Sequence, residues 1–443
     1  MSMRKMKDSG IEWIGQIPED WKVVKTKYSY TNKKKVVGED AENYQRLALT
    51  LKGVIQRSKE DSQGLQPEEF KGYQILQENE LVFKLIDLEN VATSRVGYSK
   101  YTGIVSPAYI VLRPKGEDES KYGEYYFLSM WQREIFNHLG DDGVRSSLNA
   151  SDLLNIPYLK ISNEEKQAIA SYLDTKCSEI DTIVRETEQT IEEYKKLKQS
   201  LITEVVTGKK RVADDGLSLS DEPREMKDSG VEWIGEVPRE WEIIRLKGLG
   251  NCQNGISKGA EYFGEDFEFP FVNYTDAYNN YEIPDPRGRA NSTQEDRIRY
   301  SLKEGDVLFT RTSETIEEIG FASTCMKDIN NAVFSGFLIR FRPTTNNLFK
   351  GFSKYYFRSS HLRRYFVKEM NLVTRASLSQ QLLKGMSVAL PSIKEQKSIA
   401  TYLDSKCSEI DRLISDKQRL LEELEIYKKS LIYECVTGKR EIN

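Results

Sequence analysis

One sequence is written twice along this chain, and this repeat limits the possible folds more than any other feature. Met6–Trp21 reads MKDSGIEWIGQIPEDW and Met226–Trp241 reads MKDSGVEWIGEVPREW, with eleven of the sixteen positions identical. A second block, AIASYLDTKCSEID at 168–181, recurs as SIATYLDSKCSEID at 398–411. The repeat therefore predicts two copies of one scaffold within a single chain.

The stretches between the repeated blocks differ from each other. The first block recurs at a spacing of 220 residues and the second at 230, so the second copy carries a net ten extra residues. Residues 25–140 and 245–370 barely match. We infer that a constant scaffold holds two different inserts, at 22–160 and at 242–391.

Residues 163–207 and 393–437 are predicted to form two long helices. Each is bounded by an S-x-x-E capping box and a glycine, namely Ser162, Glu165 and Gly208 in the first copy and Ser392, Glu395 and Gly438 in the second. At 1.5 Å per residue each helix would be roughly 65 Å long.

Apolar residues recur every seven positions along both helices, which is typical of a coiled coil. The stripe includes Leu173, Ile180 and Leu201 in the first helix and Leu403, Ile410 and Leu431 in the second. Such a stripe needs a partner, so we expect the two helices to pack antiparallel about a pseudo-two-fold axis. Polar residues interrupt it at Thr187, Lys198, Lys417 and Lys428. We interpret these interruptions as a drifting seam or snorkelling lysine stems rather than a lock on the helix register.

The bulk properties exclude several classes of protein. A length of 443 residues exceeds the usual size of one core and predicts at least two domains. Five scattered cysteines and two histidines are too few for a disulfide framework or a metal centre. No apolar run approaches a membrane span and no signal-peptide core is present, so we expect the protein in the cytoplasm. The net charge of −4 argues mildly against nucleic-acid binding, but it does not show how charge is distributed.

Both inserts are rich in aromatic and β-branched residues broken by Gly, Pro, Asn and Asp, which predicts mixed α/β domains. The predicted strands include 80–83, 108–112, 306–309 and 337–341, and the predicted helices are 122–139 and 350–370. Side chains in the predicted loops have the chemistry to hold phosphates or read base edges. The candidate DNA-binding residues are Lys33, Lys34, Lys35, Arg57, Arg95, Lys100, Arg145, Asn254, Ser257, Lys258, Arg311 and Arg375.

Arg145 and Arg375 differ from the other candidates because their surroundings repeat. VRSSL at 144–148 matches TRASL at 374–378 with the same 230-residue spacing as the helices. A shared contact with the DNA backbone and a bridge to the adjacent helix both explain this match, and we favour the DNA contact.

Motifs for catalysis are missing from the sequence. It contains no glycine-rich phosphate loop, no adenine-methyltransferase signature of the Asp/Asn-Pro-Pro-aromatic type and no nuclease carboxylate–lysine cluster. The chain is therefore predicted to bind rather than to catalyse, and we assign it no catalytic, cofactor-binding or metal residues.

Several segments together resemble type I restriction–modification specificity subunits. The pattern W-I-G-x-[IV]-P-x-x-W occurs at 13–21 and 233–241, and LPSIKEQKSIATYLDSKCSEIDRLI occupies 390–414. GIVSPAYIVLRP at 103–114 and KEGDVLFTR at 303–311 resemble the target-recognition domains of that family. The likeness spans essentially the whole chain.

One departure from the family pattern lies before the first helix, where KISNEEKQ at 160–167 replaces LPSIKEQK. The resemblance implies the following domains: an N-terminal target-recognition domain at 1–160, a central conserved helix at 161–208, a linker at 209–225, a C-terminal target-recognition domain at 226–391 and a distal conserved helix at 392–443.

The resemblance also implies a function and partners. Each target-recognition domain would read one half of a two-part site in double-stranded DNA, and the helices would set the distance between the halves. Two methyltransferase subunits would dock for adenine N6-methylation, together with restriction subunits that act as translocase and nuclease. S-adenosylmethionine, ATP and Mg²⁺ would belong to these partners, and this chain would hold no cofactor and be no enzyme itself.

Two alternatives remain open. The chain could serve a type IIB system, which the sequence does not distinguish from type I. It could also be a coiled-coil scaffold that does not bind DNA, an alternative that the net acidity favours slightly.

Overall fold

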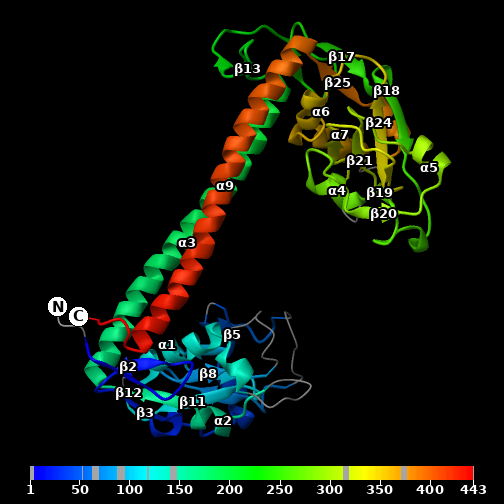
Figure 1. Cartoon of the computed structure of the whole chain (residues 1–443). Coiled ribbons are helices and arrows are strands. Elements are labelled where there is room, and N and C mark those ends of the chain that lie inside the picture. The colour runs from blue at the N-terminus through cyan, green and yellow to red at the C-terminus, as the bar shows by residue number, and fades with distance from the viewer. Residues whose placement is uncertain are drawn as a thin grey trace. The chain divides into compact units, whose positions relative to one another are not determined.

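The computed structural model describes residues 4–51, 53–61, 69–86, 95–116, 119–139, 147–312, 319–370 and 377–442. The chain forms two compact units (Figure 1). Unit 1 comprises Met1–Glu188 with Gln418–Asn443, and unit 2 comprises Gln189–Lys417. Each unit therefore contains one insert, the start of one long helix and the end of the other. The boundaries that we predict for five domains along the chain stay predictions.

The two predicted long helices are confirmed as α3 (Asn163–Val206) and α9 (Ile393–Val436). The Glu165 amide donates to Ser162 Oγ at 3.2 Å, and the Glu395 amide donates to Ser392 Oγ at 3.3 Å, so the serine half of each predicted capping box forms. Capping satisfies amides that have no partner within the first helical turn.

Each unit pairs one end of α3 with the opposite end of α9. In unit 1, Lys428 of α9 forms an ion pair with Asp181 of α3 at 2.5 Å. In unit 2, Lys198 of α3 forms the equivalent pair with Asp411 of α9 at 2.6 Å. The helices are thus antiparallel, as predicted. These lysines interrupt the apolar stripe because they reach across to the other helix, a cause that we did not favour from the sequence.

Short strands build the insert of unit 1. They are β1 (Met6–Asp8), β2 (Gln16–Pro18), β3 (Lys22–Lys25), β4 (Tyr30–Thr31), β5 (Arg46–Thr50), β6 (Gly53–Arg57), β7 (Gln74–Leu76), β8 (Leu81–Phe83), β9 (Val96–Tyr98), β10 (Gly103–Val105), β11 (Ile110–Pro114) and β12 (Pro157–Lys160). Two four-stranded sheets have the orders β6-β5-β10-β7 and β4-β11-β8-β9, and β1-β2 and β12-β3 form two-stranded pairs.

Unit 2 repeats much of this pattern. Its strands are β13 (Arg211–Val212), β14 (Leu219–Ser220), β15 (Met226–Asp228), β16 (Glu236–Pro238), β17 (Glu242–Arg245), β18 (Gly250–Asn254), β19 (Phe269–Val272), β20 (Gly288–Ala290), β21 (Val307–Thr310), β22 (Ala322–Thr324), β23 (Val333–Phe334), β24 (Leu338–Pro343) and β25 (Ser387–Leu390). The order β18-β24-β21-β22 matches β4-β11-β8-β9, and β17-β25 matches β3-β12.

Shorter helices complete both inserts. They are α1 (Glu119–Gln132), α2 (Ala150–Asn155), α4 (Tyr274–Asn279), α5 (Gln294–Arg299), α6 (Lys350–Tyr356), α7 (Ser360–Met370) and α8 (Gln380–Gly385), with the 3-10 turns η1 (Thr26–Tyr28), η2 (Gly38–Asn43), η3 (Ile135–His138), η4 (Leu246–Gly248) and η5 (Ala260–Tyr262). The mixed α/β class that we predict is confirmed. The predicted helices at 122–139 and 350–370 are each broken in two. In the first, Glu134 adopts a left-handed φ of 59° at the break.

Tyrosines attach each insert to the long helices. Tyr125 of α1 donates to Asp174 of α3 at 2.7 Å, and Tyr355 of α6 makes the same bond to Asp404 of α9 at 2.8 Å. Burial, followed by this hydrogen bond to Asp174, raises the pKa of Tyr125, so its hydroxyl remains a donor. The two inserts therefore sit on the same attachment points although their sequences differ.

The repeated WIG segments form matching clusters with the starts of the long helices. The Trp21 indole donates to Glu165 at 3.2 Å and the Trp241 indole donates to Glu395 at 3.1 Å. Each carboxylate also forms an ion pair at 2.6 Å with an arginine, Arg4 in unit 1 and Arg224 in unit 2. Trp21 and Trp241 are fully buried, so these clusters belong to the core.

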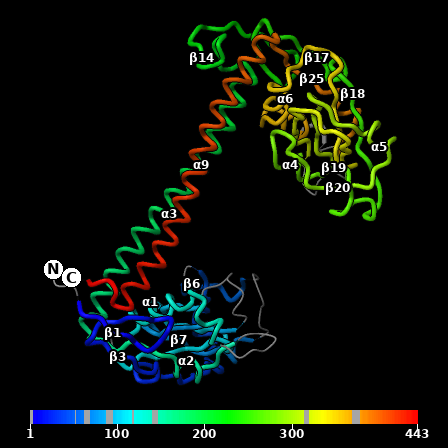
Figure 2. The backbone as a smooth tube through the Cα atoms, viewed as in Figure 1, coloured from blue at the N-terminus to red at the C-terminus, as the bar shows by residue number. Residues whose placement is uncertain are grey.

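The end of α9 closes unit 1. Tyr433 Oη donates to the carbonyl of Ile14 at 3.0 Å, and Lys439 Nζ donates to the same carbonyl at 3.0 Å. The start and the end of the traced chain accordingly lie next to each other in Figure 2. This contact joins the last turn of the second repeat to the first repeated block. In the part of the chain that is described, no helix has the length and apolarity to cross a membrane.

The two units differ in the buried polar contact between the first turn of the long helix and the insert. Lys166 is 4% exposed and pairs with Glu119 at 2.5 Å in unit 1. Tyr158 also donates to the Glu119 carboxylate, at 2.9 Å. At the matching position of unit 2, Gln396 is fully buried and accepts a hydrogen bond from the Phe349 amide at 2.7 Å.

We predict that Lys166→Met destabilises unit 1 by about 3–5 kcal/mol, because a buried carboxylate loses its counter-charge. Amide hydrogen exchange measures this loss: the amides of α1 should exchange faster in the variant, while those of unit 2 should exchange as in the wild type. The double variant with Glu119→Gln should recover most of the protection. Lys176→Met, which breaks an exposed pair, should change protection by less than about 1 kcal/mol. Wild-type exchange of α1 in Lys166→Met would contradict the prediction.

Candidate nucleic-acid interface

In unit 2, the loop 254–258 lies against the turn 335–337. The Gly336 amide in the turn donates to the carbonyl of Ile256 in the loop at 2.7 Å. A Cβ atom on Gly336 would lie 2.9 Å from the backbone oxygen of Ile256, as well as 2.2 Å from Ser257 Oγ, so this close approach of the two backbones requires glycine. The loop and the turn thus form one surface with fixed backbones.

Arg311 joins this surface from the end of β21. Its amide donates to the carbonyl of Phe337 at 2.8 Å, and its Nη1 donates to the carbonyl of Gly336 at 3.4 Å. The side chain is half-buried. The structure therefore brings Ser257 and Arg311, which the sequence separates by more than fifty residues, to the same turn.

Asn254 lies at the other end of the loop and contacts the start of α8. The amide groups of Asn254 and Gln380 are 3.0 Å apart. The Leu378 amide, two residues before Gln380, donates to the carbonyl of Arg311 at 2.8 Å. Three predicted DNA-binding residues, Asn254, Ser257 and Arg311, consequently gather around one turn.

Lys258 is exposed at the end of the loop. Its Nζ lies 5.1 Å from the centroid of the Tyr262 ring, whose hydroxyl donates to Asp296 at 2.6 Å. Burial and the hydrogen bond to Asp296 raise the pKa of Tyr262, which keeps the hydroxyl protonated. Lys258 therefore presents its charge from an aromatic support.

Arg340 lies on β24, next to the loop 254–258, and is not among the DNA-binding candidates predicted from the sequence. It is 6% exposed and hydrogen-bonds Gln253 of β18. Burial, followed by the adjacent Arg342 cation, lowers the pKa of Arg340 to about 10, so it stays charged at neutral pH. A buried arginine in the middle of a strand has no loop signature that would have identified it.

The loop 33–35 of unit 1 occupies the place of 254–258. Its three lysines are exposed, and Lys34 Nζ donates to the carbonyl of Pro107 at 3.3 Å. Pro107 belongs to the turn 106–108, which precedes β11 as the turn 335–337 precedes β24. Unit 1 thus presents three ammonium groups where unit 2 presents an amide, a hydroxyl and one lysine.

Strand register supports this equivalence. Tyr30 of β4 pairs with Pro114, and Gly250 of β18 pairs with Pro343. Counting four residues forward from the first member of each pair reaches Lys34 in unit 1 and Asn254 in unit 2.

The remaining candidates of unit 1 lie elsewhere in its insert. Arg57 is half-buried on β6 and pairs with Asp61 at 3.2 Å. Lys100 is exposed beside β9. Arg95 has no exposed surface, so its position gives no support to a DNA contact. The roles of these three residues stay predictions.

Arg145 and Arg375 lie outside the described residues. The first described residues after each of these two segments are Ser147 and Ser377. They occupy equivalent places in the two units, since Ser147 forms an isolated β-bridge with Ile86 and Ser377 forms one with Thr312. Thr312 directly follows Arg311, so Ser377 lies next to the surface around the turn 335–337.

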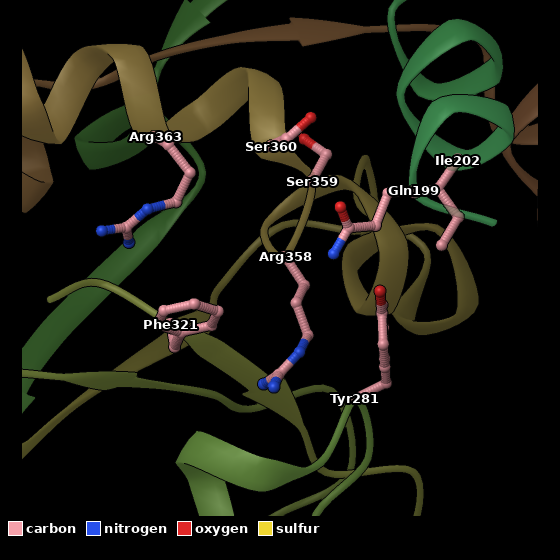
Figure 3. Close-up of a pocket in the computed structure, with 8 residues that line it drawn as sticks. All are labelled: Gln199, Ile202, Tyr281, Phe321, Arg358, Ser359, Ser360 and Arg363. Carbon is pink, nitrogen blue, oxygen red and sulfur yellow. The ribbon is translucent and has the colours of Figure 1, made fainter. Parts of the chain in front are cut away.

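Arg358 links the segment after α4 to strand β22 in unit 2. Its guanidinium donates to the carbonyls of Asn280 at 2.8 Å and Ala322 at 3.0 Å. It also lies 4.9 Å from the Tyr281 ring centroid and 5.2 Å from that of Phe321 (Figure 3). A cavity of about 280 Å³ adjoins these residues and is also lined by Gln199, Ile202, Ser359, Ser360 and Arg363. Since Arg358 is engaged by backbone carbonyls, we interpret it as a structural support.

Metal and thiol chemistry have little basis in the described residues. Within them, no group of three His, Cys, Asp or Glu side chains is arranged to hold a metal ion. All five cysteines are buried and free. Burial raises the pKa of Cys177 to about 11 and that of Cys407 to about 11, so both thiols remain protonated at neutral pH.

Comparison with known proteins identifies relatives along nearly the whole chain. The MjaVIII specificity subunit of a type I restriction enzyme from Methanocaldococcus jannaschii is 24% identical over 96% of this chain and 94% of its own length. The EcoKI specificity subunit from Escherichia coli K12 is 22% identical over 65% of this chain and 58% of its own length.

Two solved structures share the fold. A chain from a study of complex assembly and conformational transition of a type I R-M system has a TM-score of 0.70 and 14% identity, covering 96% of this chain and 99% of that one. The HsdS subunit from Thermoanaerobacter tengcongensis has a TM-score of 0.53 and 14% identity, covering 96% and 98%. The fold that the resemblance implies is confirmed.

A family model adds direct evidence for one part of the chain. Residues 238–425 match the type I restriction modification DNA specificity domain. This match covers the whole second insert and α9 as far as residue 425. The chain is thus similar to type I restriction–modification specificity subunits along nearly its whole length, and residues 238–425 match the DNA specificity domain of these proteins.

Proposed function

We propose that this chain is the DNA-specificity subunit of a type I restriction–modification complex and reads a two-part DNA site, one half with each unit. The observation that carries the proposal is the pair of equivalent loops, 33–35 and 254–258, which differ in chemistry on matching strands. A reader of two different half-sites needs the same placement with different side chains.

The chemistry of the loops supports contact with DNA. Exposed lysines neutralise phosphates and release counterions, whereas asparagine and arginine hydrogen-bond to base edges. Lys33–Lys35 therefore favour contacts with phosphates, and Asn254 with Arg311 favours reading of bases. The net charge of −4 is compatible with this proposal because it does not determine the local charge of a loop such as Lys33–Lys35, whose three lysines are exposed.

The long helices supply equivalent surfaces for a partner in each unit. Unit 1 exposes Ile183 and Tyr427, which are 44% and 48% accessible. The positions related by the 230-residue repeat, Leu413 and Leu197 in unit 2, are 39% and 53% accessible. Large apolar side chains at repeated, exposed positions support the docking of two copies of one partner.

We propose that each of these two exposed apolar surfaces binds one methyltransferase subunit. These subunits would bind S-adenosylmethionine and rotate an adenine out of each half-site for N6-methylation. ATP and Mg²⁺ would belong to restriction subunits that join the same complex. In this proposal the chain supplies sequence recognition and assembly, and its partners supply the catalysis.

We predict that the chain determines which adenines are methylated. Co-expression with the neighbouring methyltransferase gene, followed by long-read mapping of N6-methyladenine, should show a two-part motif with a fixed gap. The motif should be lost when this chain is omitted. An assembled complex that leaves no mark dependent on this chain would contradict the proposal and favour a scaffold that does not bind DNA.

We also predict that charge on the exposed apolar helix positions removes one methyltransferase at a time. Ile183→Glu with Tyr427→Glu should weaken docking on unit 1 by about 2 kcal/mol or more, roughly 30-fold, because a charge would be buried at the interface. Native mass spectrometry should then show one methyltransferase copy instead of two.

The matched control is Leu197→Glu with Leu413→Glu, which should remove the other copy, and the fourfold variant should remove both. All four side chains are exposed, so the melting temperature of the free chain should change little. Retention of both copies by the fourfold variant would show that the partner docks elsewhere.

A further inference from the structure

Phe337 is an exception to the burial of aromatic residues in unit 2. It is 61% exposed at the tip of the turn 335–337, whereas Phe334 and Phe341 on either side of the turn are fully buried. An exposed phenyl ring gains nothing from burial in the fold itself. Its position leaves the ring available to a partner outside the chain.

The turn holds Phe337 rigidly. The Phe337 carbonyl accepts from the Arg311 amide at 2.8 Å, and its amide lies 3.2 Å from Ser335 Oγ. The Ser335 amide donates to the carbonyl of Val272 at 2.9 Å, which connects the turn to β19. Because the backbone of the turn is already fixed, binding through Phe337 costs little backbone entropy.

Polar DNA-binding candidates surround the ring. Ser257 packs against Gly336, and Arg311 hydrogen-bonds both Gly336 and Phe337 through its side chain and backbone. Proteins that bend DNA combine cations on the backbone with an apolar wedge between base pairs. The arrangement around the turn 335–337 has both parts.

Unit 1 lacks the aromatic side chain. β24 and β11 pair with their neighbours in the same register, which aligns Phe337 with Ala108, and Ala108 is also exposed. A methyl group is too small to separate base pairs. Any wedge therefore acts on one half-site alone.

We propose that Phe337 inserts between two neighbouring base pairs of the half-site read by unit 2 and unstacks them, an inference that rests on the proposed function. The ring supplies the apolar wedge, and Arg311 and Ser257 hold the adjoining backbone or base edges. The half-site read by unit 1 stays stacked at the equivalent place.

The test uses the complete methyltransferase complex and duplexes carrying the motif found by methylation mapping. Phe337→Ala should weaken binding to this motif roughly 10- to 100-fold, the effect of losing one aromatic stack on a base. The slope of affinity against salt should stay unchanged, because no phosphate contact is lost. Phe337→Leu keeps an apolar wedge and should fall between wild type and alanine.

Fluorescence locates the insertion. 2-Aminopurine is placed at successive steps away from the methylated adenine and its neighbours, because base flipping by the methyltransferase also brightens the probe there. It should brighten at one such step of the unit 2 half-site with wild-type complex and stay dark with Phe337→Ala. The matched control is Leu217→Ala, because Leu217 is 69% exposed on unit 2 but lies in the β13–β14 hairpin. This control should bind and unstack like wild type.

Three results would overturn the inference. Wild-type affinity and fluorescence in Phe337→Ala would show that the ring does not touch DNA. Loss of a methyltransferase copy in that variant would assign the ring to a protein contact. If the wild-type complex showed no preference for the mapped motif over unrelated DNA, the proposed function would fail, and this inference with it.

Discussion

Each unit is completed by a helix end that belongs to the other copy of the sequence repeat. Gly208, after α3, packs against Pro238 and Trp241 in unit 2, and Gly438, after α9, packs against Pro18 and Trp21 in unit 1. A Cβ atom would lie 2.4 Å from Pro238 at the first site and 2.5 Å from Pro18 at the second. Both glycines also have a positive φ, so each contact depends on a residue without a side chain.

The constant scaffold, hereafter the frame, consists of the repeated segments ending in Trp21 and Trp241 together with α3 and α9. This dependence explains why the sequence of the frame repeats while the sequences of the inserts do not. The tryptophan, glutamate and arginine clusters at the helix starts must be the same in both units because each receives the same kind of helix end. The contacts between insert and frame are localised and include the strand pairs, the tyrosine–aspartate bonds and the buried partners of Lys166 and Gln396. Positions of the insert away from these contacts are therefore free to differ. Different residues at Lys34 and Asn254, or at Ala108 and Phe337, follow from that freedom.

The frame could be predicted from the sequence because its signals are local. Capping boxes and terminal glycines bounded α3 and α9 within a residue, and the heptads showed that the two helices pair. The ion pairs of Lys198 and Lys428 could not be predicted, since they depend on which residue of the partner helix stands opposite. Such exposed pairs contribute little stability each, but they match at both ends.

The candidate interface was harder to predict than the frame. Basic residues in loops are easily found, but the sequence does not show that Ser257 and Arg311 meet at one turn, or that Arg95 is buried. Phe337 was missed because the run 337–341 predicts a strand, whereas the strand begins at Leu338 and leaves the ring in the turn. Tertiary contacts decide these points, and they have no local signature.

Exchange of an insert tests most directly whether a common frame presents two independent readers. Residues 246–386 would be replaced by a second copy of 26–156, between strands that pair in the same register. Gln396→Lys would be added so that the second copy of Glu119 keeps its buried partner.

Methylation mapping of this double-insert chain is the decisive measurement. Two independent readers on a common frame should give a symmetric motif, in which the half-site read by the first insert appears twice in inverted orientation across a gap like that of the wild type. Persistence of the second wild-type half-site would contradict it, because recognition would then reside in the frame and not in the inserts.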